Sequence, residues 1–435
     1  MGGQMSDPVG FAMPESIDFG DFVVATYLYR TEARVDIHRA ALALAEMQST
    51  GTWVALDRET AAIRERHAGR VIAVWEVPDH ETGIPADADG RSWVLQVAYP
   101  AHNIGDQMPL LLATVYGECA SAGQLKLLDL HLPESFVRAF RGPGFGLEGI
   151  RELVGVSDRP LLITMVKPAL GLTPAESAEV FLEAALGGVD MIKDDELLVS
   201  HPWSHFADRV REHGRAARQA FEETGHRTLY FVNITDRPDR LVANAYQALE
   251  AGASGLMVDH VTVGVAALSM LAEDPAITVP ILGHLAFAGA IYASPWSGVS
   301  SHLVLGKLPR LAGADMLVYP SPYGSLKLAR SKHLRLAQSM TAPFHGIRRA
   351  MPMPGGGLHA GMVPLLVADL GIDHAFGAGG AVLGHPMGAT AGARAIRQAM
   401  DAVVQGRPLA EAAREHAELA AALEAWPEAT ADPDD

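Results

Sequence analysis

The stretch PLLITMVKPALGLTPAESAEVFLEAALGGVDMIKDDE, residues 160–196, contains the pattern that decides the fold. An apolar run at 160–166 precedes a segment with helical spacing, and a second apolar run follows at 188–192. Similar runs, separated by segments long enough for a helix, recur downstream: LYFVN (229–233), SGLMV (254–258), VPILG (279–283), DMLVY (315–319), RAMPM (349–353) and DHAF (373–376). Eight strand–helix units over about 250 residues predict an α/β fold of the (β/α)8 TIM-barrel type. The alternative, an open doubly wound sheet, needs only about five or six strands.

The residues before this region mix strands and helices without a repeated unit. Strand-like runs occupy 22–30, 69–78, 92–100 and 125–133, and a helical pattern occupies 35–48. The segment RGPGFGLEG (141–149) contains several glycines and a proline, which predicts a linker. We therefore expect four parts: an N-terminal arm (1–20), an α+β domain of ferredoxin-like type (21–145), a barrel catalytic domain (146–410), and a C-terminal helix with an acidic tail (411–435).

Composition excludes several classes of function. The 435 residues include 34 basic and 51 acidic side chains, so the formal net charge is −17 and binding to nucleic acid or to an anionic membrane is not expected. No apolar run reaches the roughly 18 residues of a membrane span, and the N-terminus lacks a secretory pattern. The single cysteine, Cys119, allows no intrachain disulfide. These features predict a cytoplasmic protein of enzyme size.

The strongest chemical signal is KDDE at 193–196, because reactive groups of such barrels follow the carboxyl ends of the strands. Alternation along the strand places Lys193 and Asp195 on the same side, toward the barrel axis, and Glu196 can turn back into the mouth. Two carboxylates and one further oxygen ligand suit Mg²⁺. A lysine becomes such a ligand if its neutral amine adds CO2 to give a carbamate. The alternative is a solvated turn whose charges cap the next helix.

Two further side chains follow predicted strands. Lys167 ends the first barrel strand, and a lysine that is partly desolvated near a cation can act as a general base. His284 follows the fifth strand. The alternative for Lys167 is a surface lysine that happens to precede a proline. The alternative for His284 is a core histidine whose hydrogen bonds are satisfied inside the protein.

Glycine-rich turns follow the last two predicted strands. They are Gly355–Gly357 and Gly379–Gly380, at positions where barrels commonly bind a phosphate through backbone N–H groups. Loops also use glycine for their own turns, but two such turns at these two strands favour a phosphate site.

Taken together, these motifs resemble the large subunit of ribulose-bisphosphate carboxylase (RuBisCO), and more closely the RuBisCO-like proteins, also called form IV. The resemblance covers about residues 22–406. It is carried by STGTW (49–53), LLITMVKPALGLTP (161–174), GGVDMIKDDE (187–196), PGGG (354–357) and LGHPMG (383–388). The pattern GGxDxxKDDE is highly specific, and the other motifs support it.

The resemblance implies roles for individual residues. Lys193 would carry the carbamate, and Asp195 and Glu196 would complete the Mg²⁺ site. Lys167 would handle the substrate proton, and His284 would be the active-site histidine. A phosphate site is implied at the following residues: Gly356, Gly357, Gly379, Gly380, Thr52 and Trp53. In the family Thr52 and Trp53 act from the neighbouring subunit, so a homodimer with active sites at the subunit interface is implied.

The sequence departs from the carboxylases at several positions. By alignment, this chain has Met47 (beside Glu46) where the carboxylases have a glutamate, Ala169 where they have a lysine, and Glu118 where they have an asparagine. Leu285 or Phe287 stands in place of a phosphate-binding arginine, and Val318 stands in place of a histidine. In the loop YPSPYGSLKLAR (319–330), neither Lys327 nor Arg330 matches the CO2-polarising lysine of the carboxylases. Each lost charge-assisted contact is worth roughly 1.5–3 kcal/mol, so a bisphosphate would bind poorly. These losses predict that the protein does not fix CO2.

The retained groups predict Mg²⁺-dependent enolate chemistry on a sugar-derived monophosphate. Polar residues in segment 294–330, including Ser297, Ser300, Ser301 and His302, favour decarboxylation of a β-keto acid of the 3-oxo-isoapionate 4-phosphate type. An enolase or isomerase of a methylthio-pentulose phosphate, as in methionine salvage, is the alternative. A non-catalytic regulatory homologue and a metal-dependent aldolase that needs no CO2 are two others.

Overall fold

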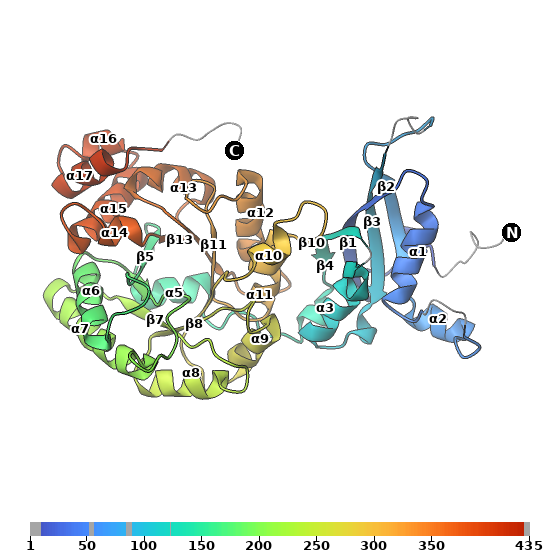
Figure 1. The fold of residues 1–435 in the computed structure, drawn as a ribbon, viewed down its shortest axis with the longest axis horizontal. Helices are drawn as coiled ribbons and strands as arrows, with labels where there is room; N and C mark the ends of the chain where they lie inside the picture. Colours follow the sequence, from blue (N-terminus) through green and yellow to red (C-terminus); the bar gives the residue numbers. More distant parts are fainter. Residues whose placement is uncertain (1–9, 52–55, 84–88, 122, 430–435) are drawn as a thin grey trace. The chain divides into compact units, whose positions relative to one another are not determined.

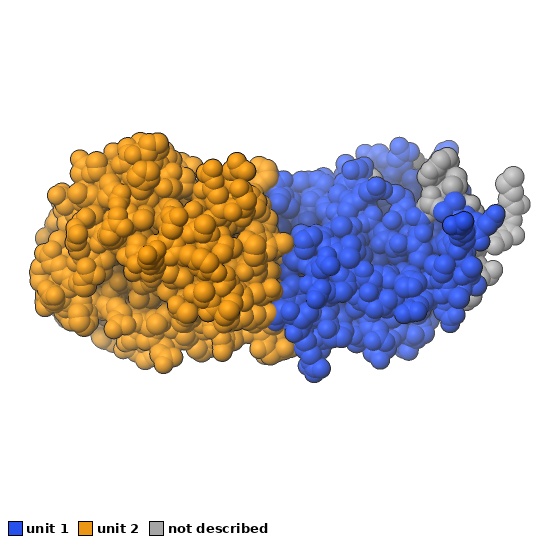
Figure 2. All heavy atoms as spheres, turned by 90° about the horizontal axis from the view of Figure 1, so that it is seen from below, with its two compact units in different colours: residues 1–140, 288–304 blue, residues 141–287, 305–435 orange. Residues whose placement is uncertain are grey.

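The chain forms two compact units. The structure, a computed structural model, describes residues 10–51, 56–83, 89–121 and 123–429. Residues 1–140 and 288–304 cluster in one unit, and residues 141–287 and 305–435 cluster in the other (Figure 2). Segment 288–304, which the sequence pattern assigns to the barrel, thus belongs by its contacts to the N-terminal unit. Among the described residues, no helix has both the length and the apolar character to cross a membrane.

The N-terminal unit is built on a mixed sheet with the strand order β10-β4-β1-β3-β2 (Figure 1). Its strands are β1 (Phe22–Thr31), β2 (Arg70–Glu76), β3 (Arg91–Pro100), β4 (Gln124–His131) and β10 (Gly298–Val299). The pairs among β1 to β4 are antiparallel, and β10 is parallel to β4. Helices of this unit are α1 (Ile37–Met47), α2 (Ala61–His67), α3 (Met108–Tyr116), α4 (Glu134–Val137) and α10 (Gly289–Tyr292). The α+β prediction is therefore confirmed.

Helix α1 shows why the local sequence folds as it does. The Asp36 side chain accepts hydrogen bonds from the backbone N–H groups of His38 and Arg39, which satisfies donors that the first turn leaves open. The buried residues of the helix recur at helical spacing: Ile37, Ala41, Leu44 and Ala45. Capping and periodicity agree, so the sequence pattern predicts this helix correctly.

Within the described residues, eight parallel strands close into a barrel (Figure 1). In their order around the barrel they are β11 (Met316–Pro320), β12 (Met351–Gly355), β13 (Ala375–Gly377), β5 (Leu161–Met165), β6 (Met191–Lys193), β7 (Leu229–Asn233), β8 (Gly255–Val258) and β9 (Ile281–Gly283). Each overlaps one of the eight apolar runs in the sequence. The barrel prediction is thus confirmed, and the open sheet is excluded.

Helices of the second unit connect the strands or follow them. They are α5 (Gly146–Val154), α6 (Pro174–Leu186), α7 (Phe206–Thr224), α8 (Leu241–Glu250), α9 (Val265–Glu273), α11 (Leu308–Leu311), α12 (Arg330–Thr341), α13 (Val363–Leu370), α14 (Gly380–Leu383), α15 (Ala389–Val404), α16 (Leu409–Ala412) and α17 (Ala417–Ala425). Single helical turns lie at η1 (Pro14–Ser16), η2 (Ala101–Asn103), η3 (Glu118–Ser121), η4 (Leu303–Lys307) and η5 (Ala360–Met362). Inside the barrel, apolar side chains such as Ile163, Phe231 and Met353 form a filled core.

Two local predictions differ from the structure. The predicted linker at 141–149 runs into α5, because the carboxylate of Asp315 accepts hydrogen bonds from the backbone N–H groups of Phe145 (2.6 Å) and Gly146 (2.7 Å). That cap is distant in sequence, so local composition cannot reveal it. The single C-terminal helix predicted within 411–435 is instead two helices, α16 and α17, and α17 packs on α15.

Candidate active site

The predicted barrel residues of the site follow three strands, of which β5 and β6 are adjacent, at one end of the barrel. Lys167 follows β5, Lys193 ends β6 and His284 follows β9. Because all eight strands are parallel, their carboxyl ends meet at the same rim. The topology alone therefore brings together residues that are separated by more than 100 positions in the sequence.

The charged residues at the end of β6 and directly after it point to two opposite sides of the chain. Lys193 and Asp195 are each 2% exposed, and the pKa values of both respond to each other's charge. Asp194 points the other way, where Arg209 on α7 donates to its Oδ2 atom at 2.9 Å. The alternation expected along this strand is present, and it places Asp194 outside the site.

Lys167 and Asp195 form a close ion pair. The Nζ atom of Lys167 lies 2.5 Å from the Oδ2 atom of Asp195, and the backbone N–H of Leu197 donates to Oδ1 at 3.1 Å. Burial is the largest single effect on the Asp195 carboxyl and opposes its ionisation, but the hydrogen bonds from Lys167 and Leu197 and the nearby lysine charges together lower the pKa of Asp195. This carboxylate is thus held in its charged form.

Burial also sets the state of the Lys193 amine. Removal from water lowers the pKa of Lys193, and the nearby Lys167 acts in the same direction, while Glu196, Asp195 and Asp259 oppose them. The net direction is downward, which favours a neutral amine. A neutral amine is the form that can add CO2.

Three more groups surround this lysine. The His284 ring lies 3.5 Å from Glu196 through Nε2 and 3.5 Å from Asp259 through Nδ1. Burial lowers the pKa of His284 well below its usual range, so the imidazole is neutral. Its Nδ1 atom accepts a hydrogen bond from the backbone N–H of Ala286 at 3.3 Å, which leaves the proton on Nε2.

Asp259 is a site residue that our sequence analysis missed. It follows β8 directly, is 5% exposed, and burial raises its pKa to about 7, with Lys193 opposing the shift. Among the described residues no donor hydrogen-bonds to its Oδ1 atom. The signal was available, because Asp259 and His260 stand immediately after the run SGLMV (254–258), where the strand-end rule selects reactive groups.

The donor set fits a carbamate-dependent Mg²⁺ site. Within the described part of the chain, no three His, Cys, Asp or Glu side chains are grouped closely enough to hold a metal ion unaided. Asp195 and Glu196 supply two carboxylates, and a carbamate on Lys193 would supply a third oxygen donor. The buried Asp259 Oδ1, which accepts no hydrogen bond there, agrees with a cationic group in this space.

The two glycine turns lie on neighbouring strands, as a shared phosphate site requires. Gly355 at the end of β12 pairs with Gly377 at the end of β13. Gly356 has φ +92° and Gly357 has φ +81°, so both adopt a conformation that side chains disfavour. A Cβ atom on Gly380 would meet no atom within 4 Å, so its backbone faces open space.

The loop between β11 and α12 is attached to α13. Tyr323 donates its hydroxyl to Asp369 at 2.7 Å, and the Nε atom of Arg330 donates to the same carboxylate at 3.0 Å. Arg330 is therefore engaged in a structural pair. Val318 lies within β11 in the barrel core and is 5% exposed.

Polar residues 294–302 belong to the N-terminal unit and pair with its sheet. Ser300 donates its backbone N–H to Leu127 at 2.9 Å, and the two residues of β10 pair with β4. This part of segment 294–330 is therefore assigned by its contacts to the N-terminal unit, whereas residues 305–330 belong to the barrel unit. Thr52 and Trp53 lie outside the described residues.

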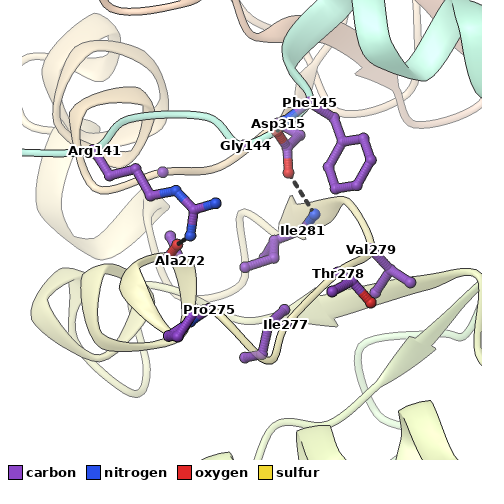
Figure 3. A pocket seen from close by; sticks show the side chains of 11 residues that line it. Arg141, Gly144, Phe145, Ala272, Pro275, Ile277, Thr278, Val279, Ile281 and Asp315 are labelled. Carbon is purple, nitrogen blue, oxygen red and sulfur yellow. Dashed lines mark hydrogen bonds between the residues drawn. The ribbon is translucent and has the colours of Figure 1, made fainter.

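A cavity of about 250 Å³ lies beside the N-terminal ends of β9 and β11, and Figure 3 shows the residues that line it. Its lining includes Ile281, which begins β9, and Asp315, which precedes β11. The Asp315 carboxylate accepts backbone N–H groups from Phe145, Gly146 and Ile281, so its role there is structural. The cavity is separate from the cluster around Lys193.

Comparison with known families agrees with the motifs. The model of the ribulose bisphosphate carboxylase large chain, catalytic domain, matches residues 146–426, and that of its N-terminal domain matches residues 16–136. Together these matches cover most of both units.

Individual relatives are similar over nearly their whole length. A ribulose bisphosphate carboxylase-like protein of Archaeoglobus fulgidus is 45% identical, covering 91% of this chain and 90% of the relative. The 2,3-diketo-5-methylthiopentyl-1-phosphate enolase of Geobacillus kaustophilus is 41% identical, covering 93% of this chain and 98% of the relative. The crystal structure of a RuBisCO-like protein (MtnW) from Alicyclobacillus acidocaldarius has a TM-score of 0.86 at 39% identity, covering 93% of this chain and 100% of that chain.

Proposed function

Because the chain belongs to the ribulose bisphosphate carboxylase large-chain family, as one of its RuBisCO-like members, we propose that it is a Mg²⁺-dependent enolase. Its substrate would be 2,3-diketo-5-methylthiopentyl 1-phosphate, or a diketone phosphate of the same class, which is the substrate named for a relative with 41% identity. The observation that carries the proposal is the buried cluster of Lys193, Asp195, Asp259 and His284 beside Lys167 at one barrel rim.

The reaction is a proton transfer. A base takes one proton from C1, the electron pair forms the C1=C2 double bond, and negative charge develops on the C2 oxygen. Protonation of that oxygen gives the enol, so no other atom is gained or lost. We assign the C1 proton to Lys167, which accepts it as the neutral amine; its side chain is 44% exposed and can meet a substrate at the rim.

The metal site would be formed by this chain's own oxygen donors. Asp195, Glu196 and a carbamate on Lys193 would hold Mg²⁺, which supplies electrostatic stabilisation to the charge that develops on the keto oxygen. The lowered pKa of Lys193, caused mainly by burial, supports carbamate formation because only the neutral amine reacts with CO2. The neutral His284 can donate from Nε2 to an oxygen of the substrate.

The phosphate would bind at the turns after β12 and β13. Their paired ends, Gly355 and Gly377, place both turns on the same part of the rim as β5. Backbone N–H groups of Gly356, Gly357, Gly379 and Gly380 would hold the phosphate. With Thr52 and Trp53 contributed by a second copy, the active unit would be a homodimer.

Enolase chemistry is favoured over decarboxylation for two reasons. Residues 294–302, which include the four polar side chains that favoured a β-keto acid, belong to the N-terminal unit, where Gly298 and Val299 pair with β4. The named relatives act on a methylthio diketone phosphate, and their similarity extends over 93% of this chain. The enolase hypothesis, an alternative in the sequence analysis, is therefore the main proposal.

Deuterium exchange tests it directly. Purified protein with Mg²⁺ and bicarbonate is incubated in D2O with 2,3-diketo-5-methylthiopentyl 1-phosphate, and C1 is observed by NMR. We expect enol formation with deuterium entering C1, and no exchange after chelation of the metal.

A β-keto-acid monophosphate serves as the competing substrate. CO2 release from it, without exchange on the diketone, would establish the decarboxylase in place of the enolase. If neither reaction occurs and Mg²⁺ binding does not depend on bicarbonate, the protein would be a non-catalytic regulatory homologue.

A further inference from the structure

A buried ion pair lies directly behind the candidate metal ligands. Asp194 and Arg209 are both 0% exposed, and the Nη2 atom of Arg209 donates to Asp194 Oδ2 at 2.9 Å. Asp194 stands between Lys193 and Asp195 in the sequence, but its side chain points to α7. The pair is therefore connected to the candidate metal ligands through the backbone of residues 193–195.

Arg209 also holds the segment that follows the ligands. Its guanidinium donates to the carbonyl oxygens of Leu198 (3.2 Å), Val199 (3.1 Å) and Ser204 (2.7 Å). Apart from a single bridge between His201 and Ser204, residues 196–205 contain no strand or helix. One planar, multidentate side chain thus replaces the ladder of hydrogen bonds that regular structure would provide.

Asp194 and Asn233 complete this support. Asp194 accepts from the hydroxyl of Tyr230 at 2.6 Å and from the backbone N–H of Asn233 at 3.0 Å. The side-chain amide of Asn233 donates to the carbonyls of Asp195 (3.3 Å) and Glu196 (3.1 Å). The backbone of both carboxylate ligands is therefore hydrogen-bonded to a residue that is itself bonded to Asp194.

We propose that Arg209 is a positioning residue of the metal site, which fixes the direction in which Asp195 and Glu196 present their carboxylates. It touches neither substrate nor metal and acts through Asp194 and the carbonyls of residues 198–204. Groups that orient metal ligands in this way typically change metal affinity by about 10–100-fold when they are removed. The inference rests on the proposed function, since it assumes that these carboxylates bind Mg²⁺.

The chain contains a matched control at the other end of the same strand. Arg159 and Asp190 form a second buried pair, with the Nη1 atom of Arg159 donating to Oδ2 at 2.7 Å and its Nη2 atom to Oδ1 at 2.8 Å. Asp190 precedes β6, whereas Asp194 follows it. Disturbing either pair weakens the same part of the barrel, but only the Arg209 pair adjoins the ligands.

The experiment compares Arg209→Lys with Arg159→Lys. Lysine keeps the charge but cannot donate to four separated acceptors as the guanidinium does. Mg²⁺ binding is measured by calorimetry in bicarbonate buffer without substrate, and unfolding is measured in urea. We expect both variants to lose stability, and Mg²⁺ affinity to fall by about 10–100-fold only in Arg209→Lys.

Three results would overturn the inference: an unchanged affinity in Arg209→Lys, an equal loss in both variants, or no Mg²⁺ binding by the wild type. If Arg209→Lys does not fold, Tyr230→Phe decides the question, because it removes only the hydroxyl that donates to Asp194. Weaker Mg²⁺ binding by folded Tyr230→Phe supports the inference, and wild-type affinity overturns it. Because no substrate is used, a wrong substrate assignment does not affect the result.

Discussion

The Nζ atom of Lys167 lies 2.5 Å from the Oδ2 atom of Asp195, and this contact joins the residues that follow two adjacent barrel strands, β5 and β6. The lysine is 44% exposed while the carboxylate is 3% exposed. The pair therefore has one end at the rim, where a substrate can reach it, and one end inside the cluster around Lys193. Such an arrangement places the proposed base beside the proposed metal ligand.

Lys167→Met is expected to lower C1 deuterium exchange by about 10²–10⁴-fold, the usual contribution of a general acid or base. Stability should change by only about 0–1 kcal/mol, because the lysine is partly exposed to screening solvent. Exchange is followed by NMR and unfolding in urea. Lys332→Met, which removes an exposed lysine from α12, is the control and should keep full activity. Wild-type exchange in Lys167→Met would show that another group acts as the base.

Lys193→Met should abolish the effect of bicarbonate on Mg²⁺ binding, because the thioether side chain cannot form a carbamate. Asp195→Asn, in contrast, should weaken Mg²⁺ binding while leaving its dependence on bicarbonate in place. Calorimetry with and without bicarbonate measures both effects. If Lys193→Met keeps a bicarbonate-dependent affinity, the CO2 adduct forms on a different residue.

Gly379 and Gly380 are expected to respond differently to alanine. A Cβ atom on Gly379 would lie 2.2 Å from the Sδ atom of Met165, whereas one on Gly380 would meet no atom within 4 Å. Gly379→Ala should therefore cost about 1–3 kcal/mol of unfolding free energy through overpacking. Gly380→Ala should fold normally and raise KM for the phosphorylated substrate, because the methyl group enters the space assigned to the phosphate. Equal stability of the two variants would contradict the packing at Met165.

Acid should weaken the fold through buried histidines. Burial lowers the pKa of His374 to about 3, so the folded chain keeps this ring neutral where the unfolded chain, with a pKa near 6.5, binds a proton. The free energy of unfolding then falls as the pH falls from about 6.5 toward 3, by up to about 1.4 kcal/mol per pH unit for this residue. Urea midpoints across this range measure the slope. His374→Gln should reduce the dependence of the unfolding free energy on pH in this range. An unchanged dependence would show that other groups cause the acid sensitivity.

A shared active site predicts complementation between inactive variants. Lys193→Met removes a group from the barrel, and Trp53→Ala removes one that the resemblance assigns to the neighbouring subunit. Exchange of subunits between the two inactive dimers should restore about one quarter of the wild-type activity, since half of the dimers are mixed and each has one intact site. Activity measured after mixing and re-equilibration tests this. A mixture that stays inactive would indicate that each subunit builds its own site.

Hydrophobic periodicity and position at strand ends predict much of the fold and of the candidate site of this protein. The run at 160–166 and its seven successors are short, apolar and regularly spaced, so the barrel can be predicted from local sequence. Parallel strands share one rim, and reactive groups follow strand ends, so the sequence alone predicts Lys167, Lys193 and His284 as site residues. Asp259 obeys the same rule, because it directly follows the run at 254–258.

Other features depend on contacts that no local pattern encodes. The cap of α5 comes from Asp315, 169 positions after Gly146, and β10 joins the N-terminal sheet although it is encoded between two barrel strands. The support of Asp195 and Glu196 by Asn233, and of Asp194 by Arg209, likewise arises only when β7 and α7 pack beside β6. Alternation and hydrophobicity act between neighbours in the sequence, so they fix strands and the rim of the barrel. The direction and charge state of each side chain depend on burial and on distant partners, which only the tertiary structure brings into contact.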